Sequence, residues 1–135
     1  MKRNSKYIIY SIFLGVLFAL IGEGIFYLIY HNDQLLDLAN LIIYTLVIVY
    51  SIPIFILFKG KQWFWSILIV IEYPVLSIIL AMIFGKAFPI EEGDLGAGIL
   101  GLITMGINGI SIISGIILGH ILRFLYYQFK QYMKK

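Results

Sequence analysis

The sequence predicts an all-α integral membrane protein, a bundle of four transmembrane helices with both termini in the cytoplasm. Of its 135 residues, 61% are hydrophobic and only 13% are charged. Soluble domains have about 45–50% apolar and about 25% charged residues. The apolar residues gather in four runs, each near the ~20 residues that a helix needs to cross a bilayer. We therefore expect residues 1–135 to form a single four-helix transmembrane domain.

The first two predicted spans cover residues 7–30 and 39–58. The first follows the basic head MKRNSK. It is longer than the apolar region of a signal peptide and lacks an A-x-A-like cleavage site, so we interpret it as a retained helix. Pro53 removes a backbone donor from the second span and predicts a kink near its inner end.

The last two predicted spans cover residues 63–85 and 96–123. The turn before the third span, KGKQ, is so short that we expect the second and third helices to be antiparallel neighbours. Asp94 is placed to cap the fourth helix. The aromatic and basic tail, residues 124–135, is expected to continue this helix or to lie along the membrane surface.

The distribution of charge predicts the topology. With the N-terminus inside, every Lys and Arg except Lys86 is cytoplasmic, which is a strong positive-inside bias. We expect a multi-pass protein of a plasma membrane, and the Ile- and Lys-rich composition favours a bacterial one. The acids of the outer loops are Asp33, Asp37, Glu91, Glu92 and Asp94.

Two stripes of small and polar residues predict which helices pack together. Their members are three or four residues apart, so each stripe lies on one helix face. We expect the first and fourth helices to pack through them. The stripe of the first helix is Ser11, Gly15, Ala19 and Glu23, and that of the fourth is Gly101, Thr104, Asn108, Ser111, Gly115 and Gly119.

Two acids, Glu23 and Glu72, fall inside predicted spans. An ionised carboxylate at the bilayer centre costs roughly 2.5–3.5 kcal/mol or more, so such residues usually face the bundle interior and have partners. A rise of about 1.5 Å per residue places Glu23, Asn108 and Tyr44 at similar depth, and Glu72 roughly 10 Å closer to the inner surface. We expect Glu23 to hydrogen-bond Asn108 and Tyr44. Interhelical packing and a proton or cation pathway both remain open as roles for the acids.

The sequence offers no catalytic or cofactor chemistry. It contains no cysteine, which excludes a disulfide, an iron–sulfur cluster and a thiol nucleophile. His31 and His120 belong to opposite ends of their helices and cannot share a metal. A nucleic-acid partner needs a continuous basic face with aromatic residues, and no soluble segment is long enough to supply one. We therefore expect no enzyme activity, cofactor, metal or nucleic-acid partner.

Two function classes fit these features. The first is a non-enzymatic accessory, partner-binding or immunity-type membrane protein, whose partners are the lipid bilayer and either another membrane protein or a second copy of the chain. The alternative is a proton- or cation-coupled small transporter or channel subunit that uses Glu23 and Glu72.

The chain resembles small multidrug resistance transporters in helix count, size and an acid in the first helix. It departs from that family in two respects. The segment around Glu23, FALIGEGIFYL, does not match the family's first-helix motif. The strong charge bias also argues against the dual-topology assembly of that family. The resemblance therefore does not assign the chain to the family.

Overall fold

A computed structural model of the chain describes residues 2–90 and 94–133, without the side chains of residues 2, 3 and 61. This part of the chain is almost entirely helical, and four of its helices are long and apolar enough to cross a membrane. They are α1 (Lys2–His31), α2 (Ala39–Leu57), α3 (Ile67–Ala87) and α4 (Leu95–Tyr132). Two 3₁₀ turns, η1 (Asp33–Leu38) and η2 (Gly60–Ser66), precede α2 and α3. The prediction of an all-α chain with four long apolar helices is confirmed.

The helix boundaries follow local sequence signals. Asp94 caps α4, because its Oδ1 accepts a hydrogen bond from the Ala97 amide at 3.1 Å. Gly60 adopts a φ of +63°, a left-handed conformation that glycine tolerates best, where the chain turns after α2. The predicted tail continues α4 as helix up to Tyr132. Among the predicted loop and tail charges, Glu91, Glu92, Lys134 and Lys135 lie outside the described residues.

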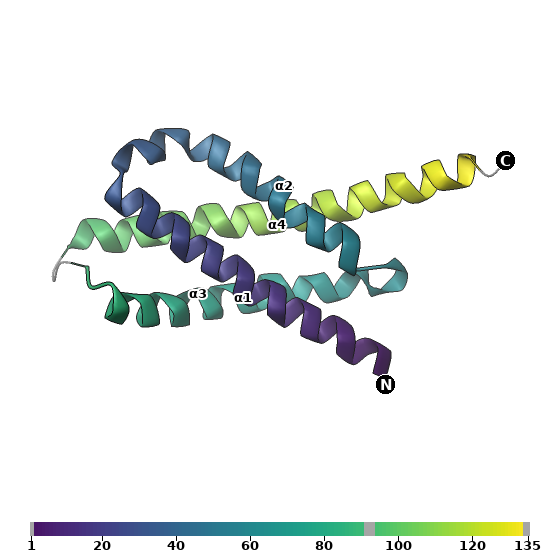
Figure 1. The fold of residues 1–135 in the computed structure, drawn as a ribbon, viewed down its shortest axis with the longest axis horizontal. Helices are drawn as coiled ribbons and strands as arrows, with labels where there is room; N and C mark the ends of the chain where they lie inside the picture. The colour runs from purple at the N-terminus through teal and green to yellow at the C-terminus, as the bar shows by residue number, and fades with distance from the viewer. Residues whose placement is uncertain (1, 91–93, 134–135) are drawn as a thin grey trace.

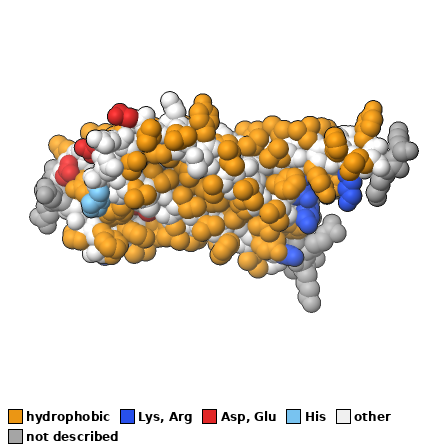
Figure 2. Space-filling view, turned by 45° about the horizontal axis from the view of Figure 1, so that its top comes forward, with side chains coloured by type: hydrophobic (Ala, Val, Ile, Leu, Met, Phe, Trp, Pro, Cys, Tyr) orange, Lys and Arg blue, Asp and Glu red, His pale blue; other side chains and the backbone are white. Residues whose placement is uncertain are grey.

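The start of α1 and the end of α4 lie at the same end of the bundle, together with η2 (Figure 1). We call this the terminal end, and we call the opposite end, which holds η1, the end of α3 and the start of α4, the distal end. Figure 2 shows hydrophobic side chains over the middle of the visible face, with basic side chains towards the terminal end and acidic ones at the distal end.

The main helix pairs are α2 with α4 and α1 with α3 (Figure 1). The first and fourth helices contact each other, as predicted, and Asn108 of the α4 stripe lies against Gly22 of α1. They do not pack along the whole of the two stripes, because Gly15 faces Glu72 of α3, whereas Gly115 and Gly119 face α2. The prediction that α2 and α3 are packed neighbours is wrong. η2 adds two turns between them, which lets α2 dock on α4 instead.

The α2–α4 seam is tight because two glycines remove side chains from it. A Cβ at Gly119 would lie 2.8 Å from the Ser51 carbonyl oxygen, and a Cβ at Gly115 would lie 2.8 Å from the Tyr50 Cβ. Small residues allow this close approach of two helix backbones. Next to the seam, the Phe18 and Tyr50 rings pack with centroids 4.1 Å apart, in a core to which all four helices contribute.

Candidate functional site

Asn108 is the polar centre of the bundle and is only 1% exposed. Its Nδ2 donates to the Phe18 carbonyl at 2.9 Å and to the Tyr73 hydroxyl at 3.2 Å. Its Oδ1 accepts from the Tyr50 hydroxyl at 2.5 Å. Tyr73 in turn donates to the Met105 carbonyl at 3.1 Å. One amide from α4 thus joins α1, α2 and α3, and both its nitrogen and its oxygen have partners within the fold.

The predicted bonds from Glu23 to Asn108 and Tyr44 are wrong. Tyr44 is 68% exposed, and Tyr50 takes its expected place. Six residues separate these tyrosines, which corresponds to a rotation of about 240° around α2. On α1 the neighbouring Gly22 faces Asn108, since a Cβ there would lie 2.5 Å from the Asn108 Nδ2. Equal depth placed the residues at one level, but the rotation of each helix decided which of them meet.

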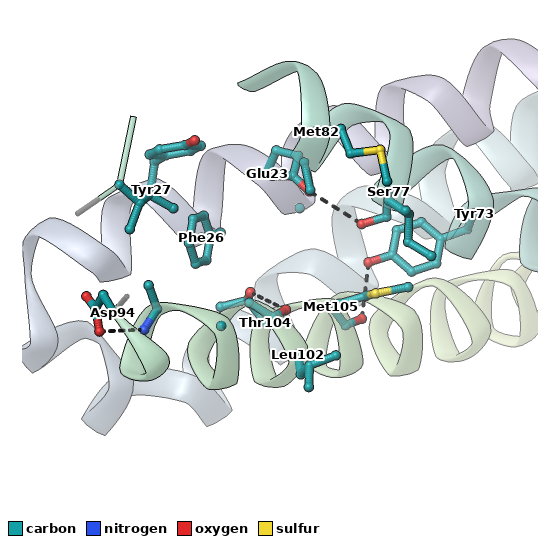
Figure 3. Close-up of a pocket in the computed structure, with 17 residues that line it drawn as sticks. Glu23, Phe26, Tyr27, Tyr73, Ser77, Met82, Asp94, Leu102, Thr104 and Met105 are labelled. Carbon is teal, nitrogen blue, oxygen red and sulfur yellow. Dashed lines mark hydrogen bonds between the residues drawn. The ribbon is translucent and has the colours of Figure 1, made fainter. Parts of the chain in front are cut away.

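Glu23 lies in a cavity of about 500 Å³ between α1, α3 and α4, in the distal half of the bundle (Figure 3). The carboxylate side chain is 7% exposed. Its Oε1 accepts a hydrogen bond from the Ser77 hydroxyl at 3.4 Å, and Ser77 is its one hydrogen-bond partner in the part of the chain that the structure describes. Aromatic and thioether side chains supply much of the remaining lining: Phe26, Tyr27, Tyr73, Met82 and Met105.

The other polar groups of the cavity are bonded to nearby backbone. The Thr104 hydroxyl donates to carbonyls of its own helix, at Leu100 and Gly101. Asp94 caps the first turn of α4. Glu23 therefore differs from its neighbours, because Oε2 has no partner and no basic group of the described residues pairs with it.

The Glu23 cavity is one end of a longer groove between α3 and α4, two helices that make few contacts. A second cavity of about 350 Å³ shares Tyr73, Leu102 and Met105 with it. A third, of about 410 Å³, continues from the second through Val70 and Ile113 towards the terminal end. We call this row of three adjoining cavities the α3–α4 groove. Its rim is open to the surface, as Leu102 is 73% exposed.

Glu72 lies outside the α3–α4 groove. It is half-buried against α1, where a Cβ at Gly15 would collide with its carboxylate. The buried Oε1 has no hydrogen-bond partner within the described residues. Glu72 and Ser77 are five residues apart on α3, or about 7.5 Å along the axis. Glu72 lines none of the three cavities of the groove, so the two acids do not form one site.

The basic and histidine side chains near the ends of the helices have separate roles. Arg123 donates to the carbonyls of Phe55 and, at 3.0 Å, Phe58, and thus binds the last turn of α2. His120 Nε2 lies 2.9 Å from the Ser66 hydroxyl, which ties α4 to η2. His31 lies on the last turn of α1, at the distal end.

No family model, curated protein or solved structure matches this chain.

Proposed function

We propose that the chain is a multi-pass protein of a bacterial plasma membrane that acts without catalysis, by holding another membrane protein in the α3–α4 groove. This is an accessory, partner-binding or immunity-type role. The single observation that carries it is Glu23, an acid in a cavity that opens sideways between two helices.

The charge distribution supports a topology with both termini in the cytoplasm. Basic side chains gather towards the terminal end and acidic ones at the distal end (Figure 2). Positive charge favours the cytoplasmic side of a membrane. In this topology the groove runs across the bilayer, and Glu23 lies in its outer half.

The fold pairs its two central polar side chains, Asn108 and Glu23, to different extents. Asn108 has a partner for both ends of its amide. Glu23 has one long bond from a neutral hydroxyl. An acid inside a bilayer costs roughly 2.5–3.5 kcal/mol or more unless it is paired, and such residues usually serve a functional site. A cavity beside this acid gives a partner access to it.

Site-specific photo-crosslinking in cells tests the proposal. A photoreactive residue replaces Leu102 on the groove rim. In the matched control it replaces Ile48, a residue on the free face of α2 that is 58% exposed. We expect a discrete protein adduct from position 102 and only lipid adducts from position 48. Lipid adducts alone at both positions would overturn the proposal.

A coupled transporter is the second candidate, and the shape of the Glu23 cavity favours it. The cavity extends to Ile90 and Asp94, at the distal end, and so gives the acid a route towards the outside. Purified protein in liposomes with an imposed pH gradient tests this function. Proton or cation flux that Glu23→Gln abolishes, with Asp37→Asn as a control, would favour it over the binding role.

A further inference from the structure

We infer that the occupant of the α3–α4 groove is a transmembrane helix of another protein that carries a lysine or arginine at the depth of Glu23. This inference rests on the proposed function and names the chemistry of its partner. It follows from the shape of the groove, from its charge and from the positions of the chain's own basic residues.

The groove is long enough for a helix. Its lining on α4 extends from Asp94 to Ile121, a rise of about 40 Å, whereas the hydrocarbon core of a bilayer is about 30 Å thick. A compact ligand would fill one of the three cavities, but a membrane-spanning helix can follow all of them. Two glycines of the lining, Gly98 and Gly106, have no atom within 4 Å of an added Cβ. Their bare backbone permits the close approach typical of helix pairs in membranes.

The charge of the groove selects the occupant. Glu23 is more than nine-tenths buried, lines the cavity and has no cationic partner among the side chains that the structure describes. Acidic and basic residues inside membranes normally pair with each other. A basic side chain on the incoming helix would supply the missing partner.

A second copy of the chain cannot supply that cation. Its predicted spans contain no Lys or Arg apart from Arg123 at the inner end. Lys86 is the basic residue nearest in sequence to Ser77, the partner of Glu23, yet it lies about 13 Å further towards the distal end of α3. Lipid amines belong to the headgroup layer, whereas Glu23 lies about 12 Å inside the end of α1 at His31.

The test uses synthetic helices as probes of the full-length protein in phosphatidylcholine–phosphatidylglycerol vesicles. The probe is a Leu-Ala transmembrane peptide with one Lys at the depth of Glu23, and the matched peptide has Gln at that position. Energy transfer between a label on the peptide and one on the protein reports association. We expect the Lys peptide to bind at least about tenfold more tightly than the Gln peptide, equivalent to about 1.4 kcal/mol.

Three variants show which residue causes the preference for the Lys peptide. Glu23→Gln keeps the size of the side chain and should remove the preference for Lys. Glu72→Gln changes the acid outside the groove and should retain it. Gly106→Leu fills the groove and should weaken the binding of both peptides. Equal binding of the two peptides to the parent protein, or a Lys preference that survives Glu23→Gln, would overturn the inference.

The outcomes also separate this inference from the proposed function. A protein adduct at position 102 with no Lys preference would leave the binding role standing and reject the charged partner. Lipid adducts alone at position 102 would reject the binding role itself.

Discussion

α4 meets α2 and α3 in opposite ways, although glycines line both contacts. Along α2, the positions of Gly115 and Gly119 are filled by the Tyr50 side chain and by backbone of the neighbouring helix. Along α3, the space above Gly98 and Gly106 is empty. The same residue type therefore closes one seam and leaves the other open. A glycine stripe indicates where a backbone can be approached, but it does not say whether the fold itself makes the approach.

The two contacts also differ in their polar groups. The α2–α4 seam includes the Tyr50–Asn108 bond and the Arg123 bonds to the end of α2. The α3–α4 groove contains Glu23, whose Oε2 has no partner among the described residues. A closed seam with hydrogen bonds between its two helices contributes to stability, whereas an open groove that contains an acid without a cationic partner is suited to binding. Four substitutions separate these roles.

The largest effect is expected from leucine at a glycine of the closed seam. Gly119→Leu forces α2 away from α4, because even its Cβ collides with the Ser51 carbonyl. We expect a loss of about 3 kcal/mol in the free energy of unfolding, measured by steric trapping in bicelles. Gly106→Leu is the matched control and should change stability by less than about 1 kcal/mol. Equal losses in the two variants would remove the distinction between the seams.

Removing the polar centre should have the next largest effect. Asn108→Leu leaves the Tyr50 hydroxyl and the Phe18 carbonyl without their partner. Interhelical hydrogen bonds in bilayers contribute about 0.6 kcal/mol on average and up to about 1.7, so we expect a loss of about 1–2 kcal/mol. Thr104→Val is the control, since that hydroxyl bonds only to its own helix. A stable Asn108→Leu protein would contradict a structural role for the amide.

A smaller effect is expected at the terminal end of the closed seam. Arg123→Met removes the two bonds to the α2 carbonyls and the favourable charge at that helix end. We expect a loss of about 1 kcal/mol, measured by the same unfolding assay. Lys130→Met, further along α4, should have no measurable effect, because Lys130 is exposed. An equal loss from both variants would indicate a general effect of charge.

The smallest effect on stability is expected in the open groove. Glu23→Gln retains a group that can bond Ser77, so the free energy of unfolding should change by less than about 0.5 kcal/mol. The same variant should lose its preference for the Lys peptide. A large loss of stability would show that the fold needs the carboxylate, and would place Glu23 with Asn108 rather than with the groove.

The sequence predicted the elements of this fold well because their signals are local. The four apolar runs match the four helices, apart from the longer ends of α1 and α4 and the later start of α3 at Ile67, and Asp94 caps α4 as expected. Partner choice was harder to predict. Rise per residue placed Glu23 and Asn108 at one depth, but the orientation of α1 turned Gly22 towards the amide.

The candidate site was predicted only in part. Glu23 stands out in the sequence, because an acid in an apolar run is costly. Its neighbour Ser77 was missed, because that contact depends on how α3 packs on α1. The open groove was missed, because it depends on how far α3 lies from α4. The tyrosine that bonds Asn108 was also assigned wrongly, as Tyr44 points outwards. The burial of Tyr50, Ser51 and Ile54 identifies the inner face of α2 only after packing is known.

The length of α4 has a consequence for how the protein meets the cytoplasm. A helix of 38 residues is about 57 Å long, whereas a bilayer with its headgroups is about 40–45 Å thick. In the proposed topology, an upright α4 extends about 12–17 Å beyond the inner membrane surface. Its tip carries exposed Phe129 and Tyr132 next to Lys130. A molecule that approaches from the cytoplasm thus meets the aromatic and basic end of α4 before it reaches the lipid.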